Sequence, residues 1–387
     1  MHEAINGCAI VGLGETPLGR RPGVSAVQLQ AEAVQSALAD AGLTRADVDG
    51  LFNLGPYSRP SMMFGSTLQE YLGIHPTAQA TIDSGGVNSP MVMLQNAADA
   101  IRRGACSIAV VTFGEPMATG QPATAAKGFS TTGPDVEFEA PMGVVGTVMP
   151  YAMLAQRHMA EFGTRPEALG AVAVSARRHA ALNPNAAKRE PMTLDDYFRS
   201  RMIASPLRLL DCSIGVDGAG ALVVTSAERA RDLRNRPVVL KGAAQYASHR
   251  NIGQFPGFDG LGIRQVGQRA LAEAGVALED IAVATIHDAF TIVTIVFLEE
   301  LGFCKRGEGS DYVVGGHIDL GARCPVNTHG GLLSQGHVGG MYHLMEAVRQ
   351  VRGDCGARQV PGAELSLCAG GGGIMGINCA MVFGRLD

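Results

Sequence analysis

A small set of side chains has the types and positions that suit proton transfer. His287 and Asp288 directly follow the apolar stretch 282–286, His337 lies inside a glycine-rich segment, and Cys368 precedes a run of four glycines. Imidazole and thiol groups can move protons near neutral pH when their surroundings tune the pKa. A single histidine or cysteine is more often structural, so the elements around these residues decide between the two interpretations.

Those elements predict an α/β fold. Apolar runs at 8–13, 48–54 and 108–113 have the length and bounding residues of buried strands. Between them, the stretches 25–41 and 85–103 carry apolar residues at helical spacing. Strands that alternate with helices in this way indicate a sheet with helices on its faces.

The histidines are predicted to lie where ligands bind in such folds. The stretch 282–286 is predicted to be a strand, so His287 lies at its carboxyl end, the edge at which open α/β sheets bind ligands. His337 lies in the glycine-rich stretch 336–340, which leads into a predicted helix. A helix N-terminus offers free N–H groups and suits an anionic ligand or a developing oxyanion.

An internal repeat predicts two similar halves. Residues 37–48 (ALADAGLTRADV) and 270–281 (ALAEAGVALEDI) share six identities and three conservative pairs at a constant offset. Both run from a helix through a glycine and an acidic turn into a strand. The predicted division is an N-terminal half of residues 1–114 and 206–235, an inserted cap of residues 115–205, and a C-terminal half of residues 236–387. In such a duplication, two glycine-led helices can point their N-termini at a shared centre.

Composition and charge narrow the function classes. The 387 residues are 46% hydrophobic and 17% charged, with a net charge of −5, which indicates a globular chain without a nucleic-acid partner. Eight single cysteines and no CxxC pair argue against a metal site and fit a reducing cytoplasm. We expect no signal peptide and no membrane span, because the apolar runs are too short.

Taken in order, the motifs resemble the thiolase superfamily, in its sterol-carrier and lipid-transfer branch. The matching segments are HDAFT from His287, G-H-x-G from Gly336, C-x-G-G-G from Cys368, NP at Asn183, SPLRLLDC from Ser205, DGAGALVV from Asp217 and LEELGFCKRGEG from Leu298. The resemblance covers nearly the whole chain. It implies an α/β fold of duplicated βαβαβ halves, in five layers α-β-α-β-α with an inserted loop or cap region.

The resemblance also implies roles on a coenzyme A thioester. His287 would help to hold the thioester oxygen, His337 would activate a nucleophile or stabilise an enolate, and Cys368 would be the acid and base for the α-proton. The oxyanion or substrate contacts would be Gly86, Asp288, Gly339 and Gly370. The expected substrate is an acyl-CoA, with no covalently bound cofactor and no metal. The expected partners are a second copy of the chain and a zinc-ribbon or OB-fold protein.

One position departs from the family pattern. Residues 97–101 fit the family's A-A-x-A-I pattern. Counted back from there, the position of the family's nucleophilic cysteine is occupied by Val87. Valine cannot form an acyl-enzyme. Ser84 and Ser89 are close, but each needs a shift of register and an activating base.

Three functions remain open from the sequence. The first is a thiolase-like acyl-CoA enzyme, similar to acetyl-CoA acetyltransferases, that makes or breaks a C–C bond without the usual acyl-enzyme. The second is a retro-aldolase on a β-hydroxyacyl-CoA, working with a zinc-ribbon or OB-fold partner. Relatives with that activity carry Tyr where this chain has His287 and His337, and Tyr342 lies one helical turn further on. The third is a non-catalytic acyl-CoA or lipid binder, or a structural subunit.

Overall fold

The computed structural model describes residues 7–120 and 133–386. The main strands are β1 (Cys8–Glu15), β2 (Gly50–Asn53), β3 (Ala78–Thr81), β4 (Ile108–Pro116), β7 (Asp217–Ser226), β8 (Val238–Ala247), β9 (Val283–Ile286), β10 (Leu365–Gly372) and β11 (Ile377–Arg385). The helices are α1 (Ala26–Ala41), α2 (Phe64–Leu72), α3 (Ser89–Arg102), α4 (Val148–Phe162), α5 (Pro166–Ala181), α6 (Leu194–Arg199), α7 (Ala227–Ala230), α8 (Ile263–Ala274), α9 (Thr291–Leu301), α10 (Gly309–Val314) and α11 (Met341–Arg352). A short hairpin pairs β5 (Met202–Ala204) with β6 (Leu207–Arg208).

The strand order repeats between the two halves. The sheet runs β3-β2-β4-β7-β1-β8-β11-β10-β9, so the order β2-β4-β7-β1 recurs as β9-β10-β11-β8. In each set the first pair is parallel and the next two are antiparallel. Strand β3, which is parallel to β2, has a counterpart in a parallel bridge between Ala284 and Val326. The duplication predicted from the repeat is therefore confirmed by the topology.

The repeated segments also fold alike in detail. Helices α1 and α8 each end at a glycine in the left-handed region, Gly42 with φ 72° and Gly275 with φ 68°. A residue without a Cβ is favoured at this C-terminal position. The chain then makes one 3₁₀ turn in each half before entering β2 or β9.

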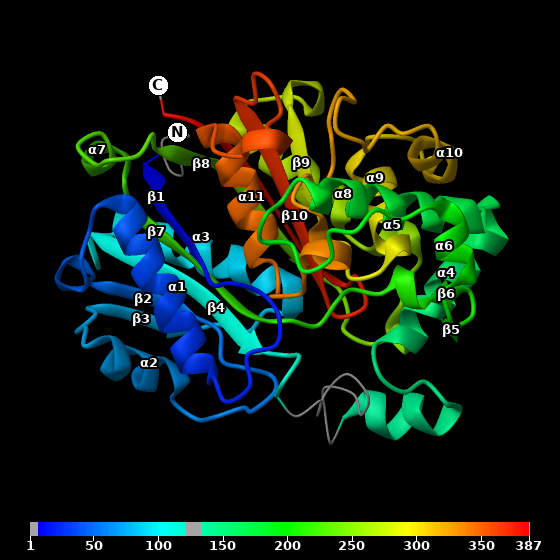
Figure 1. Cartoon of the computed structure of the whole chain (residues 1–387), viewed down its shortest axis with the longest axis horizontal. Coiled ribbons are helices and arrows are strands. Elements are labelled where there is room, and N and C mark those ends of the chain that lie inside the picture. The colour runs from blue at the N-terminus through cyan, green and yellow to red at the C-terminus, as the bar shows by residue number, and fades with distance from the viewer. Residues whose placement is uncertain (1–6, 121–132, 387) are drawn as a thin grey trace.

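Three hydrophobic cores give the five predicted layers. Helices α1 and α2 cover the outer face of the N-terminal strands, and α8 and α9 cover the outer face of the C-terminal strands. Helices α3 and α11 share the middle core with the inner faces of both halves, which meet edge to edge at β1 and β8. In Figure 1 the outer helices of the two halves lie at opposite sides of the molecule. The predicted α-β-α-β-α arrangement is confirmed.

The predicted cap packs on the C-terminal half. Helices α4 and α5 contribute to the same core as α8 and α9, and these helices lie together on the right of Figure 1. The ring of Tyr151 on α4 stacks on Phe290, 4.5 Å between centroids, just before α9. The division of the chain at residues 115 and 205 remains a prediction. In the described part of the chain, none of the helices combines the length and apolarity that crossing a membrane requires.

Helix α3 begins at Ser89, four residues later than predicted, whereas α11 begins at Met341, directly after the glycine-rich stretch 336–340. The preceding glycines have positive φ, 84° at Gly85 and 52° at Gly339, and lie outside the helical region. These glycines therefore belong to the loops that build the site described next.

Candidate active site

The carboxyl end of β9 places His287 in a buried position beside the glycine run of β10. Its backbone N–H donates to the carbonyl of Ala369 at 2.9 Å, which extends the parallel pairing by one residue. The imidazole packs edge-on against Phe297, 5.9 Å between centroids. A Cβ at Gly371 would lie 3.0 Å from Nδ1 of His287. The missing side chain at Gly371 therefore makes the room that the ring occupies.

Asp288 joins the loop after β9 to α11. Its buried Oδ1 accepts from the backbone N–H of Leu332 and from Nε2 of His343, each at 2.9 Å. A Cβ at Gly331 would lie 1.7 Å from the other carboxylate oxygen, so only glycine fits there. Oδ2 of Asp288 has no hydrogen-bond partner among the described residues, so the predicted contact of Asp288 with substrate remains a prediction. His343 was not predicted; its signal in the sequence is a second histidine six residues after His337, on a buried helix.

His337 lies in the loop before α11, and its ring is half-buried. Its backbone N–H donates to the carbonyl of Ile214 at 2.8 Å. Burial lowers the pKa of His337 to about 4; Asp288 opposes this effect and His343 adds to it. Burial also lowers the pKa of His287 well below its usual value, with smaller contributions from His343 and His337. Both imidazoles are therefore neutral at pH 7 and can donate an N–H.

Several ring nitrogens in this group lack a protein partner. Among the described residues, Nδ1 of His287, His337 and His343 is buried and has no hydrogen-bond partner. Buried polar atoms are normally paired, so these nitrogens are free to bind a ligand or water. We call His287, Asp288, His337 and His343 the histidine group.

The two glycine-led loops meet beside this group, as the duplication predicts. A Cβ at Gly340 would lie 2.1 Å from the carbonyl oxygen of Val87, and a Cβ at Gly372 would lie 1.8 Å from that of Gly85. Gly339, predicted to contact substrate, packs on the ring of Phe113. Residues 253 and 287 positions apart in the chain thus come into close contact through their backbones.

The loop before α3 holds the position of the family's nucleophile. Val87 is buried and 2% exposed, so no reactive group stands there. The amide of Gly86, predicted as an oxyanion donor, donates to the hydroxyl of Tyr57 at 3.2 Å. Ser89 is also occupied, because its hydroxyl accepts from the N–H of Ser84 at 2.9 Å. In the described residues neither serine hydroxyl bonds to a histidine.

Cys368 lies on β10, and its contacts separate it from the histidine group. Its thiol is fully buried, 3.9 Å from the sulfur of Met91 on α3. Burial raises the pKa of Cys368 to about 12, with a small lowering by Thr285. A Cβ at Gly370, two residues on along the same face, would lie 2.0 Å from the methyl carbon of Met91. Met91 therefore covers both predicted positions, and their roles remain predictions.

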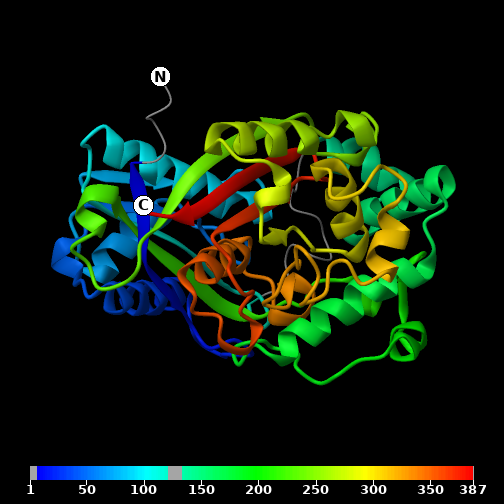
Figure 2. The same ribbon diagram turned by 90° about the horizontal axis from the view of Figure 1, so that it is seen from above.

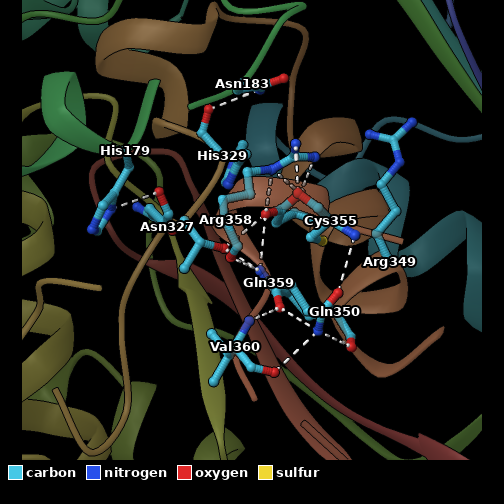
Figure 3. A network of polar contacts seen from close by, with 12 residues as sticks. His179, Asn183, Asn327, His329, Arg349, Gln350, Cys355, Arg358, Gln359 and Val360 are labelled. Atoms are coloured by element: carbon cyan, nitrogen blue, oxygen red, sulfur yellow. Dashed lines mark hydrogen bonds and ion pairs between the residues drawn. The ribbon is translucent and has the colours of Figure 1, made fainter. Parts of the chain in front are cut away.

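A second polar network lies behind the site and fixes α11 (Figure 3). The carboxylate of Glu346 accepts two hydrogen bonds from Nε of Arg358, at 2.9 and 3.2 Å, and one from Nη2, at 3.0 Å. It also accepts from the hydroxyl of Thr328 at 2.7 Å. The ring of His329 lies edge-on to His343, 4.8 Å between centroids, and links the two networks.

Comparison with known proteins agrees with this fold and site. The family model "Thiolase, N-terminal domain" matches residues 8–228, and "Thiolase C-terminal domain-like" matches residues 244–385. This chain belongs to the thiolase superfamily. The resemblance inferred from its motifs is confirmed.

Two curated relatives and one solved structure are similar over almost the whole chain. The 17-hydroxy-3-oxo-4-pregnene-20-carboxyl-CoA lyase of Mycobacterium tuberculosis is 40% identical, over 95% of this chain and 96% of the relative. The steroid side-chain-cleaving aldolase of Thermomonospora curvata is 37% identical, over 89% and 90%. A structure of an Ltp2-ChsH2(DUF35) aldolase superposes with a TM-score of 0.89 at 35% identity, over 99% and 98%.

These findings support an enzyme over a non-catalytic binder or structural subunit. The chain is a thiolase-like enzyme that acts on a C–C bond next to an acyl-CoA thioester. Both the lyase and the acyltransferase forms of this activity occur among the proteins that it resembles.

Proposed function

We propose that this enzyme is a retro-aldolase that cleaves the Cα–Cβ bond of a β-hydroxyacyl-CoA. The observation that carries the proposal is Val87, a buried apolar residue at the position of the family's nucleophile. Acyl transfer through a covalent intermediate needs a nucleophile there, and the nearby Ser89 hydroxyl accepts a backbone hydrogen bond. An aldol cleavage needs only proton transfer and a place for the enolate.

The histidine group supplies what this cleavage requires. Neutral His337 takes the proton of the β-hydroxyl as its C–O bond becomes a carbonyl. The Cα–Cβ electron pair passes to the thioester, and the N–H of His287 stabilises the resulting enolate oxygen. The imidazolium of His337, which Asp288 stabilises, then returns the proton to the α-carbon. The products are a ketone or aldehyde and a shortened acyl-CoA, with no covalent intermediate.

This assignment gives His337 the proton transfer that the sequence resemblance gives to Cys368. The thiol of Cys368 is fully buried in contact with Met91, and burial raises its pKa to about 12, far above neutral pH. A group so buried is poorly suited to exchange a proton with substrate. His337 is only partly buried, and the carboxylate of Asp288 acts on it.

The relatives suggest the substrate and one partner. Because two of them are named for steroid cleavage, we assign a CoA thioester with a bulky, steroid-like acyl group. The complex with a DUF35 protein suggests a similar zinc-ribbon or OB-fold partner for this chain. We also propose a homodimer. All eight cysteines are free, which supports a reducing cytoplasm.

Two assays on the full chain test the proposal, alone and with a co-expressed DUF35-type partner. A steroidal β-hydroxyacyl-CoA should release a ketone and a shortened acyl-CoA in equal amounts. Intact-protein mass spectrometry after incubation with acetyl-CoA and longer acyl-CoAs should show no adduct. A stable acyl adduct on Ser84 or Ser89 would support acyl transfer instead. Bound acyl-CoA with neither product nor adduct would contradict both enzymatic versions.

A further inference from the structure

A short connecting segment, residues 211–215, runs between the two loops that carry the histidines. The N–H of Ser213 donates to the carbonyl of Ala289 at 2.9 Å, and the N–H of Ile214 donates to that of Leu332 at 3.0 Å. The carbonyl of Ile214 accepts from the N–H of His337 at 2.8 Å. The segment therefore bonds to the loop after β9 on one side and to the loop before α11 on the other.

Two isolated β-bridges mark the same connection. Cys212 pairs antiparallel with Phe290, and Gly215 pairs parallel with His337. The side chain of Val216 then packs against Gly336, where a Cβ would lie 2.7 Å from it. The segment thus pairs with the loop after β9 near its start and with the loop before α11 near its end.

One end of the connecting segment is fixed by the carboxylate of Asp211, which is fully buried. It accepts from the hydroxyl of Thr291 at 2.5 Å and from the hydroxyl of Tyr197 at 2.9 and 3.0 Å. It also accepts from the N–H of Arg208 at 2.6 Å. Thr291 is the first residue of α9, directly after the loop that begins with His287. Asp211 therefore connects the segment, the predicted cap and the histidine loop.

We propose that Asp211 is a positioning residue that sets the distance between His287 and His337. The proposal rests on the retro-aldolase function, because it assigns both histidines to one enolate. The histidines come from loops 50 residues apart, and the connecting segment bonds directly to both. Oxyanion donors act only within a narrow range of positions, and misplacement by about 1 Å can cost 100-fold in rate.

Thr291 offers a matched pair of variants for the test. Thr291→Val keeps the shape of the side chain but removes the hydroxyl that bonds to Asp211, whereas Thr291→Ser keeps the hydroxyl. We expect Thr291→Val to lower kcat by about 10- to 100-fold with KM changed less than about threefold. Thr291→Ser should stay within about threefold of the wild type in kcat. Asp211→Asn should resemble Thr291→Val. Asp195 is exposed on α6, the helix that carries Tyr197, and Asp195→Asn should leave both kcat and the pKa of His337 unchanged.

NMR titration of His337 provides a readout that does not depend on turnover. Asp288 and His343 face this ring from the other elements of the site, and neither is changed by the variants. In Thr291→Val a loosened His337 should gain solvent, and its pKa should rise from about 4 toward the ordinary value. The melting temperature of each variant separates this effect from general unfolding.

Two results would overturn the positioning role. One is wild-type kcat in Thr291→Val together with an unchanged pKa of His337. The other is an equal loss in Thr291→Ser and Thr291→Val, which would trace the effect to packing. If wild-type enzyme shows no cleavage but Thr291→Val still moves the pKa of His337, the retro-aldolase function fails while the positioning role stands.

Discussion

At the level of single residues, the proposed mechanism assigns to the histidine group the chemistry that Val87 cannot perform. His287 and His337 are held neutral by burial and share Asp288 and His343 as neighbours. A neutral imidazole can both donate to an oxyanion and accept a proton. Covalent chemistry is therefore not needed for breaking a C–C bond at this site.

The histidine and the cysteine differ in the effect that their removal should have. His337→Ala should lower kcat by about 100- to 10,000-fold, the typical contribution of a general acid and base, while acyl-CoA still binds. Cys368→Ala, which removes a thiol packed under Met91, should keep kcat within about tenfold. Steady-state kinetics and CoA-binding calorimetry on both variants check this. A greater loss in Cys368→Ala than in His337→Ala would return the proton transfer to the thiol.

The pH profile should report the lowered pKa of His337. Below a pKa of about 4 the ring is protonated and cannot accept the proton of the β-hydroxyl. The acid limb of kcat/KM should therefore lie near pH 4 to 5, not near the ordinary histidine value. Because the folded form binds the proton less readily than the unfolded chain, stability should fall as pH drops from about 6.5 toward 4. An acid limb at pH 6.5 in the wild type would contradict this assignment.

At the level of helices, strands and loops, glycines let two loops and the end of β10 approach one another closely. The backbones at Gly340, Gly370 and Gly372 approach Gly85 and Val87 so closely that side chains cannot fit between them. In Figure 2 the orange stretch of chain near residue 330 lies in the middle of the molecule. Close backbone approach, not helix-end geometry alone, brings the two halves together at the site.

Gly372→Ala tests this close approach. Its new Cβ would lie 1.8 Å from the carbonyl oxygen of Gly85, a backbone atom that can move only with its loop. We expect a loss of about 1–3 kcal/mol in unfolding free energy, the usual cost of overpacking, and a lower kcat. Gly7→Ala, where a Cβ would meet nothing within 4 Å, is the control. Equal stability of the two variants in urea titration would disprove the contact.

The ion pair behind the site should fix α11 and, through it, His343. Glu346 and Arg358 are both buried, and removal of one partner leaves an uncompensated charge. Arg358→Met should therefore cost about 3–5 kcal/mol, and the added Glu346→Gln substitution should recover part of the loss. The exposed pair of Glu364 and Arg385 is a control, and Glu364→Gln should cost little. If denaturant titration gave the same unfolding free energy for Arg358→Met and Glu364→Gln, this role of the buried ion pair would be refuted.

At the scale of the whole molecule, the two halves share one middle core. Helices α3 and α11 pack together against the inner strands of both halves, and β1 pairs with β8. The active site is assembled from both halves at this layer, so its geometry depends on the integrity of each.

Unfolding should therefore be a single cooperative event for the two halves. Far-UV circular dichroism reports the helices of both halves, and near-UV signals of the tyrosines report packing, including that of Tyr57 on Phe113 in the N-terminal half and of Tyr151 on Phe290 in the C-terminal half. The two transitions should coincide within error because neither half keeps its core alone. Two separated transitions would show that each half folds independently.

The sequence alone identified the fold family and several of the residues that the proposed mechanism uses. The repeat at 37–48 and 270–281 predicts the duplication because helix ends and turns leave local signatures. The ordered motifs at His287 and His337 identify the superfamily, and the count to Val87 exposes the missing nucleophile.

Which of these residues are in contact became clear only from the three-dimensional structure. Local pattern cannot show that Asp288 bonds to His343, 55 residues away, or that Met91 covers Cys368 across 277 residues. Nor can it show that Asp211 connects the histidine loops, because burial and hydrogen bonding over such distances depend on the packing of whole layers. The sequence therefore determined the inventory of groups, and the packing of two halves around α3 and α11 determined which of them form one site.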